Sequence, residues 1–148
     1  MIRRIALVLA AAALGAGGTA SAAPLDTGIE LIRGSGRAVL TLQGAMLGSL
    51  DRGRITVAVR RGEPEVLVQG YEWVRNARNG SVVYGGHDIR FRVFRGAWRV
   101  TLLGSGIDAS AVGAGTIGLR GSGRYSLDGG AYLPWPSEYR VIVLADNR

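Results

Sequence analysis

The 148-residue chain contains no cysteine, so no disulfide bond and no cysteine-linked lipid can stabilise or anchor it. Histidine occurs once, at His87. Because a protein zinc site usually takes three or four ligands from cysteine, histidine and carboxylates, this composition argues against zinc, and we expect no metal and no cofactor. The Gly-x-Gly segments precede strand-like runs rather than a helix, which argues against a phosphate-binding or dinucleotide-binding loop.

Lysine is also absent. All 18 basic residues are arginine, against 11 acidic residues, a choice that we attribute to GC-rich coding bias. The arginines support a binding hypothesis only through their positions, which are considered below.

The N-terminal segment has the organisation of a secretory signal peptide. Arg3 and Arg4 precede an apolar run of small residues from 5 to 18, and Ala20-Ser21-Ala22 follows as a cleavage signature. The run is shorter than the about 20 apolar residues that a membrane-spanning helix needs. We therefore predict a helical signal peptide over 1–22 and a secreted or cell-envelope-associated domain over 23–148, with no transmembrane segment after cleavage.

Glycine is abundant, with 24 residues, and it separates short segments in which apolar and polar side chains alternate. A period of two is typical of β-strands. In 88–95, for example, Ile89 and Phe91 alternate with Arg90 and Arg92. We expect about ten short strands and no helix in the exported domain. The candidates include 29–33, 38–43, 53–61, 64–69, 71–75, 81–84, 88–95, 97–103, 107–111, 116–120, 124–127 and 139–145.

The turn residues predict how some of these strands pair. We expect 88–95 and 97–103 to form a hairpin through Gly96. A second hairpin should join 71–75 and 81–84 through Asn79-Gly80, whose tolerance of positive φ suits a tight turn. Asp128-Gly129 offers a similar turn after 124–127.

Many short strands with turn residues between them favour a single all-β domain, an antiparallel β-sandwich or barrel. A stacked β-helix, or solenoid, is the alternative, because the Gly-x-Gly rhythm of 104–123 would suit it, although no fixed period runs through the whole chain. The sequence Arg-Gly-Ser-Gly-Arg occurs in both 32–37 and 119–124. This echo either marks two equivalent edges of the fold or reflects a common loop composition.

The segment LRGSGRYSLDGGAYLPWP, residues 119–136, resembles the carboxy-terminal part of secreted, glycine-rich β proteins of high-GC bacteria that have no known activity. The resemblance covers about the last third of the chain. It implies a β-rich exported protein, and it brings no cofactor and no site residues.

His87 is the candidate for acid–base chemistry, because an imidazole near a carboxylate can act as a general base. Asp88 follows it, but adjacent residues of a regular strand point to opposite faces and would not orient one another. Ser35, Ser105 and Ser122 lie in Gly-Ser-Gly loops and lack the Gly-x-Ser-x-Gly elbow of many hydrolases. We therefore expect no catalytic residue and keep a small hydrolase using His87 as an alternative.

The arginines give the strongest functional indication. If 88–95 and 97–103 pair, then Arg90, Arg92 and Arg99 form one cationic patch, which Arg54 and Arg60 could extend. Arginine binds phosphates and carboxylates bidentately. The alternative is a solvated sheet face on which the arginines pair with acidic residues of neighbouring strands.

Trp135 lies in a stiff Leu-Pro-Trp-Pro segment, where each proline restricts the backbone. Its ring either plugs the core at one end of the sheet or stacks on a ligand. Arg90, Arg92, Arg99 and Trp135 are the candidate binding residues.

Three hypotheses follow from these features. The first is a non-enzymatic exported β-domain that binds or organises an anionic cell-envelope polymer or surface protein through the arginine face. Nucleic acid is not expected as a partner, because the chain lacks the aromatic ladder and basic groove of single-strand binders. The second is a structural module that self-assembles by strand pairing at glycine-rich edges such as 119–125. The third is the hydrolase.

Overall fold

A computed structural model of the chain describes residues 27–144. The predicted signal peptide and its cleavage site lie outside the described residues. Over 27–144 there is no helix, and six strands form one antiparallel sheet that does not close on itself, so the predicted all-β antiparallel fold is confirmed. The strands are β1 (Thr27–Arg61), β2 (Glu65–Gln69), β3 (Trp73–Asn76), β4 (Val82–Leu127), β5 (Leu133–Pro134) and β6 (Arg140–Leu144).

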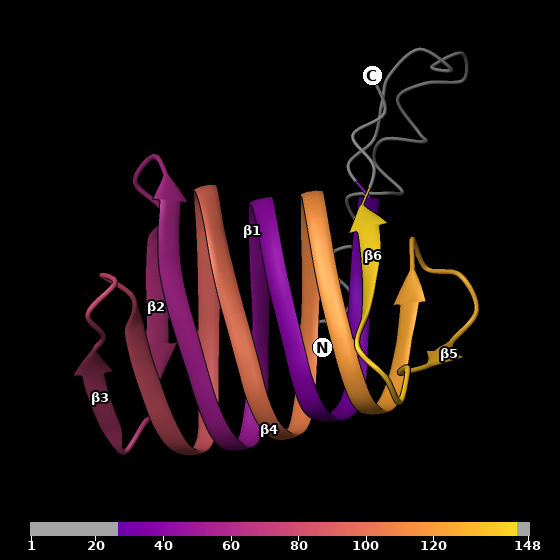
Figure 1. The fold of residues 1–148 in the computed structure, drawn as a ribbon, viewed down its shortest axis with the longest axis horizontal. Coiled ribbons are helices and arrows are strands. Elements are labelled where there is room, and N and C mark those ends of the chain that lie inside the picture. The colour runs from indigo at the N-terminus through magenta and orange to yellow at the C-terminus, as the bar shows by residue number, and fades with distance from the viewer. Residues whose placement is uncertain (1–26, 145–148) are drawn as a thin grey trace.

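The two long strands, β1 and β4, wind together as a flattened coil (Figure 1). Each passes the other on both sides: Val39 of β1 lies between Thr101 and Gly118 of β4, and Thr101 lies between Val39 and Thr56. Positions 17 residues apart along one strand therefore lie two strands apart in the sheet. β1 and β4 have 35 and 46 residues, against about 5 or 6 for an ordinary strand.

The coil has two broad walls that meet at sharp bends, and we name the outer surface of each wall after one short strand. The β6 face carries the outward side chains of β6, of β3 and of residues 37–43, 54–60, 97–103 and 116–120. The β2 face carries those of β2, of β5 and of residues 30–32, 47–49, 90–94, 108–110 and 124–126. In Figure 1 the β6 face is turned toward the viewer.

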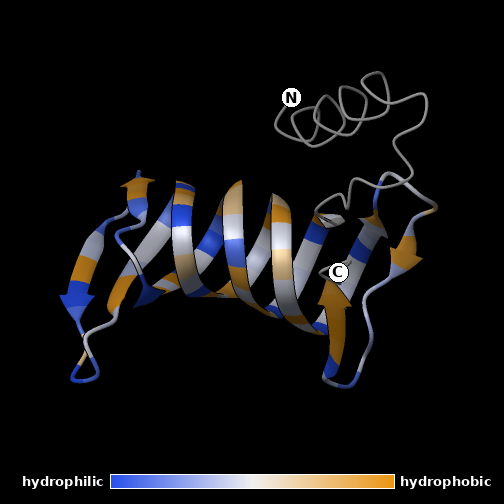
Figure 2. Cartoon of the chain, turned by 90° about the horizontal axis from the view of Figure 1, so that it is seen from above, coloured by the Kyte–Doolittle hydropathy of each residue, from blue (hydrophilic) through white to orange (hydrophobic). Residues whose placement is uncertain are grey.

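The inward side chains of both walls form a single core. Leu40 of β1 lies between Val100 and Ile117 of β4, and all three are 0 % exposed. Hydropathy alternates along the coiled strands in Figure 2, as a sheet with one buried side requires. Trp98 is also fully buried, and its indole Nε1 donates a hydrogen bond to the Gly44 carbonyl oxygen at 3.2 Å.

Glycines make one of the bends possible. Five of them form an unbroken row across neighbouring strands, in the order Gly86, Gly53, Gly104, Gly36, Gly121. Their φ angles lie between 135° and 155°, a range that is essentially restricted to glycine. A Cβ at Gly53 would meet the Leu103 carbonyl oxygen, and one at Gly104 would meet that of Arg52. The strands can therefore turn the corner without breaking their pairing.

This bend explains why the expected number of strands was wrong. The glycines that the sequence pattern marked as strand ends are corners inside two continuous strands, so six strands replace about ten short ones. The predicted hairpin of 88–95 with 97–103 was also wrong. These segments follow one another in β4 on opposite walls, because Arg95 (φ 65°) and Gly96 (φ 69°) turn the chain around the second bend.

Two other turn predictions are confirmed. β3 pairs with the start of β4, with Asn76 opposite Val82, across the Asn79-Gly80 turn. The Asn79 Oδ1 accepts a hydrogen bond from the Ser81 backbone N–H at 3.1 Å, which closes that turn. Asp128 and Gly129 form a turn after β4, and β5 then pairs back onto Arg124 and Tyr125.

The sequence echo marks equivalent positions on the row of glycines. Ser35 lies opposite Ser122, Gly36 opposite Gly121, and Arg37 opposite Arg120. Ser35 also lies opposite Ser105, so three Gly-Ser-Gly segments lie side by side at one bend. β1 and β4 are antiparallel, so they reach this bend in opposite chain directions. The repeat therefore does not occur at a regular spacing in the sequence.

We expect Gly53→Ala to lower the free energy of unfolding by about 3 kcal/mol, because the new Cβ meets a carbonyl oxygen and φ is unfavourable. Gly80→Ala is the matched control: φ is 85°, but no atom lies within 4 Å of the added Cβ, so the cost should be about 1 kcal/mol. Urea denaturation measures both. Equal losses in the two variants would show that close packing at the bend contributes nothing.

Candidate functional site

The arginines of the β6 face include Arg37, Arg54, Arg99 and Arg120. Each is exposed, and each is flanked in sequence by a buried residue of the core. Threonine and valine fill the surface between them, at positions 39, 41, 56, 101 and 116. Among the described residues of this face, as its ranges are given above, no side chain is acidic.

Arg37 and Arg120 lie directly opposite one another on neighbouring strands. Like charges in this position destabilise a sheet, since directly opposed residues have Cβ atoms about 5 Å apart. Within residues 27–144, the ion pairs are His87 with Glu72 and Arg95 with Glu65, and neither involves an arginine of the β6 face. These guanidinium groups are therefore available to an anion from outside the chain.

Two neighbours shape this cationic surface. The Arg99 Nε donates a hydrogen bond to the Thr41 Oγ1 at 3.2 Å, so its guanidinium lies along the sheet rather than extending freely into solvent. Leu103, 36 % exposed, separates Arg37 from Arg54 in the same cross-strand row. The surface thus combines positive charge with a short apolar patch.

The expected patch of Arg90, Arg92 and Arg99 does not form. Arg90 and Arg92 lie on the β2 face, where they pair with Gln69 and Leu67 of β2, whereas Arg99 lies on the opposite wall. The bend at residues 95 and 96 separates them. Of the two suggested extensions, Arg54 joins Arg99 on the β6 face, and Arg60 is exposed near the second bend.

The β2 face differs in charge. Arg90 and Arg92 line a shallow, open hollow of about 320 Å³ together with Leu47 and Leu67. Acidic residues share this wall, including Glu30, Glu65 and Asp108. Its mixed charge makes it less suited to a polyanion than the β6 face.

Trp135 belongs to the core and not to a binding surface. It is 4 % exposed, and its ring covers Gly34, where a Cβ would collide with it. Its indole Nε1 donates a hydrogen bond to the Arg124 carbonyl oxygen at 3.0 Å. Its backbone N–H donates a hydrogen bond to the Gly123 carbonyl oxygen at 2.9 Å. Of the two interpretations of Trp135, the plug is the one that the structure shows.

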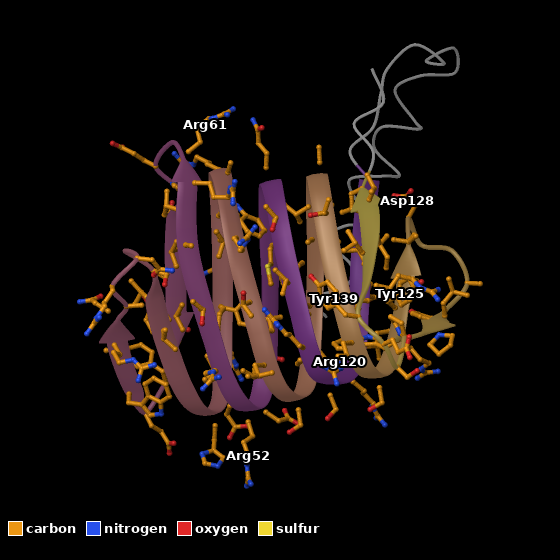
Figure 3. All side chains as sticks on the ribbon, viewed as in Figure 1. Arg52, Arg61, Arg120, Tyr125, Asp128 and Tyr139 are labelled. Carbon is orange, nitrogen blue, oxygen red and sulfur yellow. The ribbon has the colours of Figure 1, made fainter. Side chains whose placement is uncertain are left out.

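Two exposed aromatic residues were not among the sequence-based candidates: Trp73 on the β6 face, and Tyr139, which directly precedes β6 at the edge of this face. The Trp73 ring lies over Gly85 and is 43 % exposed, and the Tyr139 ring lies over Gly118 and is 49 % exposed. Tyr139 and Arg120 are labelled together in Figure 3, near β6. A glycine opposite an aromatic residue on a neighbouring strand is the feature that could have indicated these rings. It can be recognised only when the register of the strands is known.

His87 has a carboxylate partner that sequence proximity did not indicate. Its Nδ1 lies 3.2 Å from the Glu72 Oε1, and both side chains are more than half exposed. On the neighbouring strand it faces Arg52, and Ser105 lies one strand further. Ser105 is therefore separated from His87 by the strand segment that carries Arg52, and the pairing does not bring these two side chains together as a catalytic pair.

Tyr84 is partly buried beside Tyr71. Burial raises the pKa of Tyr84 above its ordinary 10.0, and the neighbouring Tyr71 raises this pKa further. The two rings are 5.0 Å apart between centroids. In the part of the chain that the structure describes, no three potential metal ligands cluster, and no helix is long and apolar enough to cross a membrane.

The segment 119–125 is not an open edge. Leu119 pairs with Ala38 on one side and Arg140 on the other, and Tyr125 lies between Leu31 and Leu133. The backbone N–H of Gly121 also donates to the Pro136 carbonyl oxygen at 2.9 Å. Strand addition by another chain at this segment would first have to displace β5 and β6.

Comparison with known proteins adds no functional assignment: no protein-family model matches the chain, and no curated protein or solved structure matches it. The resemblance of 119–136 to secreted glycine-rich β proteins stays a prediction.

We expect Trp135→Ala to lower the free energy of unfolding by about 4 kcal/mol, because it leaves a cavity in the core. Trp73→Ala, which removes an exposed ring, should cost less than about 1 kcal/mol. Thermal or urea unfolding compares the two. A Trp135 variant as stable as the Trp73 variant would contradict the assignment of Trp135 to the core.

We expect Arg120→Gln to raise the free energy of unfolding by about 0.5 kcal/mol at low salt, because it relieves the opposition to Arg37. The gain should shrink as salt screens the charges. Arg90→Gln is the control, since its direct partners, Ser49 and Gln69, are uncharged. A loss of stability in Arg120→Gln, with none in the control, would mean that Arg120 stabilises the fold.

Proposed function

We propose that this protein is an exported, non-enzymatic β-domain that binds an anionic polymer of the cell envelope through the arginines of the β6 face. The observation that carries the proposal is the direct opposition of Arg37 and Arg120 on a face that holds no acidic side chain among its described residues. Opposed cations cost stability when nothing bridges them, and an anionic ligand group removes that cost.

The exposure of these arginines favours a polymer over a small anion. An ion pair at a solvent-exposed site contributes about 0.2–1 kcal/mol, so one contact gives little affinity. Arg37, Arg54, Arg99 and Arg120 can engage several charges of one chain at once, and each contact raises the effective concentration of the next charge. A repeating polyanion therefore gains most from this face.

The wall itself supports recognition of an extended ligand. Paired strands hold the Cα atoms of the arginines at fixed spacings of about 4.8 Å per strand, which limits the backbone entropy that binding could cost. The Arg99 contact with Thr41 orders one side chain further. A flat, ordered wall suits a polymer lying across the strands.

The location follows from the predicted signal peptide over 1–22 and is part of the proposal. An exported protein would meet envelope polymers that carry carboxylates and phosphates. It would meet nucleic acid only where that nucleic acid has left the cytoplasm. Residues 23–148 would act after cleavage as a single domain.

The test compares two double variants that remove equal charge from opposite faces. Arg37→Gln with Arg120→Gln should weaken co-sedimentation with isolated cell envelope at least about tenfold, because two contacts of a multivalent site are lost. Arg90→Gln with Arg92→Gln, on the β2 face, should change binding less than about twofold. The wild-type interaction should weaken as salt rises from 50 mM upward.

Either of two results would overturn the proposal. One is the absence of binding by the folded wild-type protein at low salt. The other is an equal loss in the two double variants, which would show that net charge rather than the β6 face governs the interaction. Circular dichroism of each variant establishes that the fold is retained.

A further inference from the structure

We infer that the polymer bound by the β6 face is an acidic polysaccharide, with Trp73 and Tyr139 stacking on its sugar rings at opposite ends of the face. This inference rests on the proposed function and adds the chemical class of the ligand. It derives from the two exposed aromatic rings, which electrostatic binding alone does not require.

Trp73 lies at one end of the face, on β3. Its indole lies against the backbone at Gly85, the residue directly opposite it, and any larger side chain at Gly85 would displace the ring. The Arg75 guanidinium carbon lies over the same ring, 5.7 Å from its centroid. An aromatic surface and a cation thus share one site, where the carboxylate of a sugar would pair with the guanidinium as the sugar ring packs on the indole.

Tyr139 lies at the other end, next to β6. Its phenol ring lies over Gly118, and Arg120 follows two residues later with its side chain on the same face (Figure 3). The pairing of an aromatic ring on a glycine with a nearby arginine therefore occurs at both ends. The two sites come from segments 66 residues apart in the sequence, so local sequence similarity does not account for the arrangement.

A continuous cross-strand row connects the two ends. From β3 it passes through Trp73, Gly85, Arg54, Leu103, Arg37 and Arg120. Five strand spacings of about 4.8 Å make this row about 24 Å long. A polysaccharide lying along it would meet an aromatic ring, then a cation, an exposed leucine and two further cations, and then Tyr139.

The combination of groups distinguishes a polysaccharide from other polyanions. The C–H faces of a sugar ring are apolar and pack on aromatic and aliphatic side chains, while carboxylates or sulfates on the ring accept hydrogen bonds from arginine. A polyphosphate or an acidic peptide backbone has no ring for Trp73 and Tyr139. Nucleobases could stack, but Trp73 and Tyr139 lie at opposite ends of the face and do not form an aromatic ladder for successive bases.

The tryptophans give a direct measurement. The chain has three, and Trp98 and Trp135 are 0 % and 4 % exposed, so acrylamide quenching of fluorescence in the folded protein reports mainly on Trp73. The probes are polygalacturonate, which is an acidic polysaccharide, and polyglutamate, which has similar charge density and no sugar ring. We expect both polymers to bind, and only polygalacturonate to protect Trp73 from quenching.

Variants then separate stacking from charge. Trp73→Ala and Tyr139→Ala should each weaken polygalacturonate binding about tenfold and polyglutamate binding less than about twofold. Tyr132→Ala is the matched control, because Tyr132 is as exposed as Tyr139, at 49 %, but contacts Glu30 of the β2 face through a 3.1 Å hydrogen bond. Its polygalacturonate binding should stay within about twofold of wild type.

The outcomes distinguish this inference from the proposed function. If both polymers bind through Arg37 and Arg120 but neither aromatic variant discriminates between them, the polysaccharide inference is wrong and the proposed function stands. If neither polymer nor isolated cell envelope binds at low salt, the proposed function is wrong as well. Stronger protection of Trp73 by a single-stranded oligonucleotide than by polygalacturonate would overturn the inference in favour of nucleic acid.

Discussion

The fold depends on a backbone conformation that only glycine adopts easily. At the bend formed by Gly86, Gly53, Gly104, Gly36 and Gly121, neighbouring strands approach so closely that a Cβ would meet a carbonyl oxygen or the backbone of an adjacent residue. Because the five neighbouring segments of β1 and β4 all turn at the same place, their hydrogen bonding continues around the corner. The coil, its two walls and its enclosed core all follow from this shared bend.

Winding out and back in antiparallel directions also creates the surface chemistry. A residue of β1 is flanked by two residues of β4 that are 17 positions apart, so each cross-strand row collects side chains from distant parts of the chain. Arg37, Leu103 and Arg54 share a row in this way. The arginines are distributed along the whole sequence. Because each row combines distant segments, one wall can nevertheless be cationic while the other carries both charges.

The opposed pair of Arg37 and Arg120 shows how the core tolerates repulsion at the surface of this structure. Each arginine lies on a strand whose inward neighbours, Ala38 and Leu119, are fully buried, so the core fixes the backbone despite the repulsion above it. A few tenths of a kcal/mol lost at the surface is small beside the burial of the core, at about 25 cal/mol per Å² of apolar area. Pairs of this kind are therefore compatible with the fold.

The sequence by itself determined the strand content, the antiparallel class and the turn at Asn79-Gly80, because alternation with a period of two and turn chemistry are local properties. Only the tertiary structure decided that Arg99 and Arg90 lie on opposite walls and that Trp135 belongs to the core. It also decided that the exposed rings of Trp73 and Tyr139 pack over glycines of neighbouring strands. Those outcomes depend on whether a glycine ends a strand or bends it, and that is decided by the neighbouring strands with which it pairs.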